Sequence, residues 1–253
     1  MNGSMIFLSL EEIRRNQDLL IGLSFPAREI NYSLMVLGEL EEMGVDGVYS
    51  EATAAGLRIA VIGKGYRGYI VKGRMRGLDA AVKILRTDAA LGGFDREAEL
   101  TMMANGIGVG PKLLGSSQHA LVLEYVEGKH LGKWIEELSV DEVDALKNVL
   151  RKSFLQARSL DGLGLDHGEL SDARKHVIVK PDLEPVIIDF GKARIKGRPS
   201  NVTSLFNYIT FGQQSGKILQ MLGVREPPIH VSQRYKRDPG EKSFNELMAA
   251  LNL

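Results

Sequence analysis

The chain has 253 residues, a formal net charge of zero at pH 7 and no cysteine. This length favours one large domain or two small ones, and the neutral charge gives no general argument for binding nucleic acid. Without cysteine, disulfides, thiolate metal sites and a cysteine nucleophile are excluded. No apolar segment approaches the roughly 18 residues that cross a bilayer. Because the N-terminus also lacks the features of a signal peptide, the sequence predicts a cytoplasmic protein without membrane contact.

Residues 1–56 are expected to form a helical extension. Ser9 and Glu12 have the spacing of a capping box, which predicts a helix over residues 9–22. A second helix follows and is expected to end at Gly44. Two short helices before a strand occur in winged-helix modules, and also where helices only pack against the domain that follows. A winged-helix extension is the single route by which the sequence allows nucleic-acid binding, which is otherwise not expected.

Short apolar runs separated by glycine or charged residues follow this extension and predict an antiparallel sheet. The runs are residues 58–62, 69–72, 80–85 and 120–126. A helix is expected near residues 94–103. A longer helix, opened by a capping box of Ser139 and Glu142, begins a mainly helical C-terminal part. We therefore expect an α+β chain with a β-rich lobe at residues 57–126, a compact helical lobe at residues 127–253, and a nucleotide between them.

A glycine-rich segment lies between the first two apolar runs. Gly63, Gly65 and Gly68 have the spacing G-x-G-x-x-G. In dinucleotide-binding folds this pattern leads from a strand into a helix, whereas here it lies between two strands. We interpret it as a β-hairpin whose backbone N–H groups approach the phosphates of a nucleotide. An ordinary glycine-rich hairpin is the alternative.

Lys83 lies in the third apolar run, and its apolar neighbours on the strand favour a side chain that points to the opposite face, into a cleft. A lysine in such a place needs an acidic partner to fix its position. Glu97 in the next helix is the preferred partner, and Glu99 is the alternative. Because residues two apart on a helix do not share a face, only one of the two glutamates is expected to reach the lysine.

The C-terminal half carries the remaining candidate groups. Asp189 ends an apolar run and is followed by Phe-Gly, so a buried strand is expected to deliver one carboxylate before the chain turns. A carboxylate at a strand end can hold Mg²⁺ against nucleotide phosphates. Upstream, residues 167–179 begin with His-Gly-Glu-Leu. His167 is expected to be a packing residue that supports Asp189 or a backbone carbonyl.

The order of these motifs resembles that of the protein-kinase-like superfamily, and most of all the compact atypical archaeal serine/threonine kinases, similar to Rio and KEOPS-complex kinases. The resemblance covers about residues 57–210 and includes the Gly-Val-Gly-Pro-Lys-Leu-Leu segment at residues 108–114. It implies a bilobal kinase-like fold. It also implies ATP-dependent transfer of the γ-phosphate to a hydroxyl, most simply on a protein.

The resemblance implies roles for individual residues. The three glycines would cover the phosphates of ATP, and Lys83, held by Glu97, would anchor them. Asp189 would bind Mg²⁺. The backbone of Glu124 and Val126, in a segment similar to a kinase hinge, would bond the adenine.

The loop that would carry the catalytic carboxylate departs from the family pattern at two positions. Glu169 stands where the family has aspartate, and His176 stands where it has asparagine, and His176 follows Glu169 by seven positions in place of the family's five. A glutamate can still orient an acceptor hydroxyl, and Asp172 is the alternative carboxylate. Because imidazole suits Mn²⁺ better than Mg²⁺, a second metal site at His176 is expected to be weak or to prefer Mn²⁺.

Two further interpretations of the function remain open on the sequence. The short segment after Gly191 leaves little room for peptide docking, which allows a small-molecule kinase of the aminoglycoside-phosphotransferase type. The substitutions at Glu169 and His176 allow a nucleotide-binding pseudokinase or an ATPase switch. Basic residues at alternate positions from Lys192 to Arg198 are either a solvated strand or a site for an acidic partner or phosphate.

Overall fold

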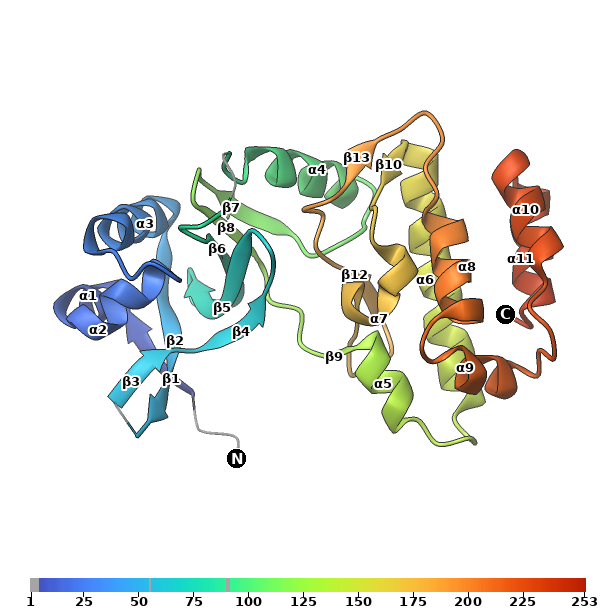
Figure 1. Cartoon of the computed structure of the whole chain (residues 1–253), viewed down its shortest axis with the longest axis horizontal. Coiled ribbons are helices and arrows are strands. Elements are labelled where there is room, and N and C mark those ends of the chain that lie inside the picture. The colour runs from blue at the N-terminus through green and yellow to red at the C-terminus, as the bar shows by residue number, and fades with distance from the viewer. Residues whose placement is uncertain (1–4, 55, 90–91) are drawn as a thin grey trace. The chain divides into compact units, whose positions relative to one another are not determined.

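The computed structural model describes residues 5–54, 56–89 and 92–253. An N-terminal antiparallel sheet region is followed by a largely helical C-terminal part, so the expected α+β class is confirmed (Figure 1). The chain divides into two compact units. The first comprises Met1–Met102 and Lys112–Tyr125, and the second comprises Met103–Pro111 and Val126–Leu253. Within the described ranges, no helix is both long and apolar enough to cross a membrane.

The first unit is built on an eight-stranded sheet. Its strands are β1 (Met5–Ser9), β2 (Val45–Thr53), β3 (Gly56–Ile59), β4 (Val61–Lys64), β5 (Gly68–Met75), β6 (Leu78–Leu85), β7 (Leu113–Ser116) and β8 (Ala120–Glu124). The main path runs β1-β2-β5-β6-β8-β7, with β3 paired to β2 and β4 paired to β5. The apolar runs therefore form strands, as expected. Three strands were not predicted: β1 and β2 come from the segment that the sequence predicted to be helical, and β7 lies outside the four apolar runs.

The N-terminal helices are α1 (Leu10–Arg15), α2 (Gln17–Leu20) and α3 (Ile30–Met43), with a 3₁₀ turn η1 (Ile21–Leu23) after α2. The predicted capping box is present: the Ser9 hydroxyl accepts from the Glu12 N–H, and the Glu12 carboxylate accepts from the Ser9 N–H. A single helix over residues 9–22 is wrong, because Asn16 has an extended backbone and its side chain caps a new helix. Gly44 ends α3 in the left-handed conformation that glycine favours, as predicted.

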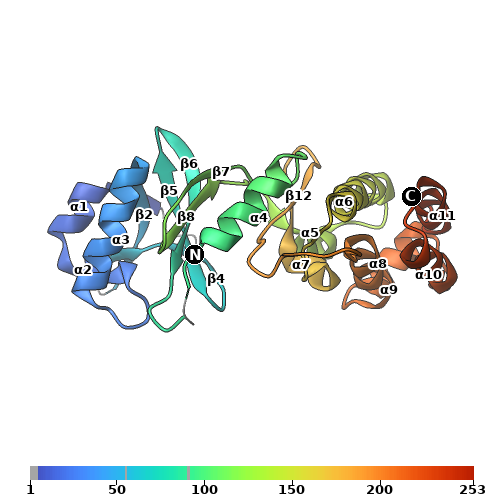
Figure 2. The ribbon, with the colours of Figure 1, turned by 90° about the horizontal axis from the view of Figure 1, so that it is seen from above.

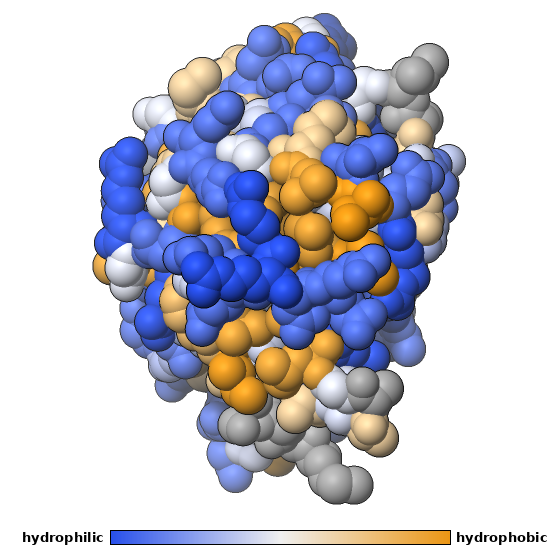
Figure 3. Space-filling view, turned by 90° about the vertical axis from the view of Figure 1, so that its left-hand side faces the viewer, coloured by the Kyte–Doolittle hydropathy of each residue, from blue (hydrophilic) through white to orange (hydrophobic). Residues whose placement is uncertain are grey.

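The N-terminal helices pack on the sheet and close one apolar core. Leu37 and Leu40 of α3 are fully buried with Val71 and Val82 of the central strands. Figure 3 shows the face of this unit that carries the N-terminal helices, where apolar surface is interspersed with hydrophilic side chains. Leu34, one turn before Leu37 on α3, remains 40% exposed. Leu37 therefore marks the core face of α3, and Leu34 marks its outer face.

The second unit contains most of the helices. Helix α4 (Asp95–Asn105), predicted near residues 94–103, begins in the first unit and ends in the second. The other elements are β9 (Lys129–His130), α5 (Leu131–Glu137), α6 (Val143–Leu163), β10 (Leu165–Asp166), η2 (Leu170–Asp172), α7 (Ala173–His176), β11 (Val177–Val179), β12 (Pro185–Ile187), β13 (Arg194–Ile195), α8 (Asn201–Phe211), α9 (Ser215–Leu222), α10 (Ile229–Arg237) and α11 (Glu241–Ala250). Helices α6, α8, α10 and α11 lie side by side (Figure 2).

The long helix α6 forms the centre of this unit. The apolar face expected from its sequence is buried, with Leu146, Leu150 and Phe154 fully inaccessible. The capping box predicted to open it is incomplete. The Ser139 N–H bonds the Glu142 carboxylate, but the Ser139 side chain does not cap the helix, which begins only at Val143.

We expect Leu37→Ala to lower the free energy of unfolding by about 2–5 kcal/mol, because it leaves a cavity in a closed core. Leu34→Ala is the matched control on the same helix and should cost less than about 1 kcal/mol, because Leu34 is exposed. Urea unfolding followed by circular dichroism measures both. An equal loss in the two variants would contradict this assignment of the core face.

Candidate functional site

The glycine-rich segment forms the predicted hairpin between β4 and β5, and the Gly65 N–H bonds the Gly68 carbonyl across the turn at 2.8 Å. Gly68 has no room for a side chain, since an added Cβ would lie 2.9 Å from the Ile84 carbonyl oxygen. The nearest contacts of an added Cβ at Gly63 and Gly65 are 3.3 Å, and neither residue has a positive φ. Packing therefore explains the glycine at position 68 much better than those at 63 and 65.

The ion pair predicted between Lys83 and Glu97 is present. Lys83, on β6, and Glu97, on α4, are 8% and 5% exposed, and the Lys83 Nζ lies 2.7 Å from a Glu97 carboxylate oxygen. The alternative partner, Glu99, is exposed. The stem of Lys83 also borders the hairpin, because an added Cβ at Gly68 would lie 3.3 Å from its Cγ. The lysine, its glutamate and the last glycine of the hairpin thus form one cluster.

The residues of the hinge-like segment lie where the chain passes from one unit to the other. Glu124 is the last residue of β8 and pairs with Ala80 of β6. Its N–H bonds the Lys112 carbonyl at 2.8 Å. Val126 is the first residue of the second unit after β8. The sheet therefore fixes the backbone of Glu124.

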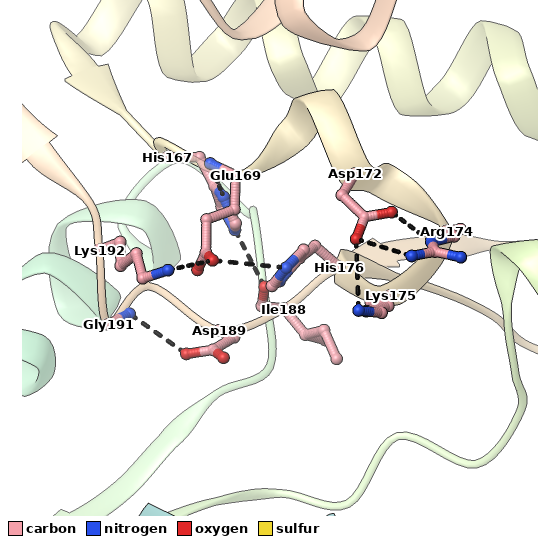
Figure 4. A network of polar contacts seen from close by, with 10 residues as sticks. All are labelled: His167, Glu169, Asp172, Arg174, Lys175, His176, Ile188, Asp189, Gly191 and Lys192. Carbon is pink, nitrogen blue, oxygen red and sulfur yellow. Dashed lines mark hydrogen bonds and ion pairs between the residues drawn. The ribbon is translucent and has the colours of Figure 1, made fainter. Parts of the chain in front are cut away.

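Three candidate residues of the second unit converge on one point (Figure 4). Glu169, His176 and Asp189 each offer a ligand atom, and these atoms lie within 4.8 Å of one another. Glu169 precedes η2, His176 ends α7, and Asp189 follows β12. The Glu169 carboxylate lies 3.8 Å from the His176 Nε2 and 2.8 Å from the Lys192 Nζ. The hydrogen bond that Lys192 donates to Glu169 raises the pKa of Lys192.

Asp189 is held in a conformation that is uncommon for a residue with a side chain. Its φ is 68°, in the left-handed region, and its carboxylate accepts a hydrogen bond from the Gly191 N–H at 3.3 Å. Gly168 also has a positive φ, and an added Cβ there would lie 2.9 Å from the Lys192 carbonyl oxygen. The chain before Glu169 and the chain after Asp189 are thus in close contact. Backbone strain of this kind is frequent at functional sites.

His167 supports the site through hydrogen bonds to the backbone, as the sequence predicted. It is fully buried, and its Nε2 lies 2.9 Å from the Ile188 carbonyl oxygen. A carbonyl only accepts, so Nε2 carries the proton and Nδ1 accepts from the Glu169 N–H at 3.3 Å. Burial lowers the pKa of His167, which favours this neutral form. One imidazole therefore joins the backbone before Asp189 to the backbone of Glu169.

The donor set of this cluster fits a divalent metal ion. The His176 nitrogen recorded beside the Glu169 carboxylate is Nε2, and within the described ranges the other ring nitrogen, Nδ1, is buried without a hydrogen-bond partner. Two carboxylates and an imidazole combine the oxygen ligands that Mg²⁺ and Mn²⁺ accept with a nitrogen that Mn²⁺ accepts more readily. Glu169, His176 and Asp189 are the residues that would hold such an ion.

Asp172, the alternative catalytic carboxylate, lies outside this cluster. Its carboxylate is 2.5 Å from the Arg174 Nε and 3.5 Å from the Lys175 Nζ. Burial acts to raise the pKa of Asp172, but the hydrogen bond and charge of Arg174 outweigh it, so the pKa is lowered. Of the two alternatives, only Glu169 lies beside Asp189.

The sequence did not identify two residues that build this site. Asn201, the first residue of α8, is fully buried and accepts the His167 N–H at 2.8 Å. No motif in the sequence marked this residue. Gly110 has a φ of 84°, and an added Cβ would lie 2.8 Å from the ring of Phe190. The glycines of the Gly-Val-Gly-Pro segment were the available signal for this contact.

No protein-family model matches the chain, and no curated protein matches its sequence.

Mn²⁺ binding tests the cluster directly. We expect Asp189→Asn and His176→Gln each to weaken Mn²⁺ binding about tenfold or more, because loss of a partner in a metal site commonly costs at least this much. Asp172→Asn is the matched control and should leave binding unchanged. Electron paramagnetic resonance of free Mn²⁺, without nucleotide, gives the affinities. If all three variants bound Mn²⁺ as tightly as the unchanged protein, the result would contradict a metal site at this cluster.

Proposed function

We propose that the chain is an ATP-dependent phosphotransferase with a kinase-like bilobal fold, of the atypical serine/threonine protein kinase type. The observation that carries the proposal is the buried ion pair of Lys83 and Glu97 beside the glycine hairpin. Burying two charges is costly, and apolar replacements of such pairs are often neutral or stabilising. The buried Lys83–Glu97 pair is therefore better explained by a role in ligand binding than by a contribution to stability.

The glycine hairpin supports a phosphate ligand. Packing excludes a side chain at Gly68, while the contacts of an added Cβ at Gly63 and Gly65 are tight but less severe. Packing alone therefore explains these two glycines less well, and glycines in a hairpin allow backbone N–H groups to approach phosphate oxygens closely. Lys83, whose position is fixed by Glu97, would then neutralise the charge of the same phosphates.

The cluster of the second unit supports transfer of the phosphoryl group. A divalent metal held by Asp189, His176 and Glu169 would neutralise charge on the β- and γ-phosphates. Glu169 is the group that would accept a hydrogen bond from the acceptor hydroxyl and orient it. Lys192 holds the Glu169 side chain, and His167 holds its backbone.

A second candidate function is a nucleotide-binding pseudokinase or an ATPase switch, which would transfer no phosphoryl group to a hydroxyl-bearing substrate. The contact of 2.8 Å between Lys192 and Glu169 favours it, because that carboxylate oxygen is already engaged. Loss of the family's aspartate and asparagine at positions 169 and 176 agrees with it. The two candidates differ in whether Glu169 is needed for turnover.

Incubation with [γ-³²P]ATP and Mg²⁺ or Mn²⁺ tests the first proposal. We expect label on the protein or on an added hydroxyl acceptor, and we expect Lys83→Met and Asp189→Ala each to reduce it about 10²-fold or more, since each removes a charge that stabilises the transferred group. Lys112→Met is the control for loss of an exposed lysine. Full labelling by either site variant would refute the mechanism, and label on an aminoglycoside alone would assign a small-molecule acceptor.

A paired comparison separates transfer from switching. In the kinase, Glu169→Gln should reduce kcat about 10²-fold or more, because it removes the carboxylate that orients the acceptor hydroxyl and weakens one ligand of the metal. Asp172→Asn should retain most activity. Wild-type turnover in Glu169→Gln would instead favour the ATPase switch.

A further inference from the structure

The basic run after Gly191 is not uniform in its contacts. The first three of its four alternating basic residues contact carboxylates: Lys192 contacts Glu169, while Arg194 and Lys196 contact Asp166. The fourth, Arg198, is exposed and has no acidic partner among the described residues. A solvated strand therefore does not describe the whole run, and Arg198 needs a separate explanation.

Arg198 lines a cavity of about 310 Å³ in the second unit. Arg158, from α6, and Lys236, from α10, line the same cavity. The three cations come from separate segments of the chain, so the fold of this unit brings their positive charges together. The volume is at the lower end of the range for small-molecule sites.

The three cations are not neutralised by the protein. None of Arg158, Arg198 and Lys236 forms an ion pair within the described ranges, although Arg234, on the same helix as Lys236, pairs with Glu246 at 2.6 Å. The Arg158 guanidinium lies over the ring of Phe244, 4.6 Å from its centroid. This contact fixes the guanidinium but leaves its charge unpaired.

The cavity lining has one carboxylate, Asp161, and that group already accepts hydrogen bonds from the protein. It accepts hydrogen bonds from the Asn201 N–H at 2.8 Å and from the Tyr235 hydroxyl at 3.2 Å. Burial raises the pKa of Asp161. With Asp161 ionised, three cations and one carboxylate leave the lining with a net charge of +2.

We propose that this cavity binds a phosphate dianion, either free hydrogen phosphate or the phosphomonoester of a phosphorylated side chain. The net charge of the lining balances that of the dianion. Arginine presents a planar fork of donors that matches phosphate oxygens, and the cavity holds two arginines. The site goes beyond the proposed phosphotransferase activity and does not depend on it.

Calorimetric titration of the whole chain with inorganic phosphate and with a phosphoserine peptide tests the site. Arg198→Ala and Lys236→Glu should each weaken binding about tenfold or more, since each removes a charge-assisted contact. Both residues are exposed, so the variants are expected to fold. Arg237→Ala is the matched control, because Arg237 is an exposed neighbour outside the cavity.

Amide chemical shifts place the ligand. Phosphate bound in the cavity should shift Gly162, Gly197 and Thr203, which line it. Equal affinity for phosphate and the peptide would assign the site to free phosphate, and tighter binding of the peptide would assign it to a phosphorylated side chain. Absence of binding at millimolar ligand, unchanged affinity in both cavity variants, or shifts confined to the glycine hairpin and Asp189 would overturn the proposal.

Discussion

The hydrogen bonds of Asn201 are the constraint on which the candidate site of the second unit depends. Its amide oxygen accepts the His167 N–H, and its amide nitrogen donates to the Leu165 carbonyl at 2.7 Å and to Asp161 at 2.9 Å. These bonds connect the end of α6, strand β10 and the start of α8. Because the residue is fully buried, losing any of these partners would leave a polar group unsatisfied. The loop that carries Glu169 is therefore held from inside the unit.

From Asn201 the network extends in two directions. On the side of the candidate metal cluster, the His167 ring hydrogen-bonds the Ile188 carbonyl, which immediately precedes Asp189. Towards α10, Asp161 receives the Tyr235 hydroxyl and borders the basic cavity. The candidate metal cluster and the proposed phosphate site thus share one buried polar support, although their ligand groups are different. Hydrogen bonds in such buried networks strengthen one another and make the surrounding structure more rigid.

Most short-range patterns in the sequence predicted the structure, although the capping box of Ser139 and Glu142 formed only in part. The capping box of Ser9 and Glu12, the end of α3 at Gly44 and the glycine hairpin all depend on residues that are close in the chain. The exceptions are also local in origin. Asn16 interrupts the first helix because its side chain caps a second one, and β2 was missed because no long apolar run marks it.

From residue 57 onward, the sequence by itself determined the change from strands to helices and the apolar face of α6, and it favoured Glu97 as the partner of Lys83. Only the tertiary structure decided that Glu169, and not Asp172, lies beside Asp189, and that Asn201 holds the loop. The physical reason is distance along the chain. A cap or hairpin is fixed by neighbours, whereas the bond from Asn201 to His167 joins residues 34 apart, and its formation depends on how α6 and α8 pack.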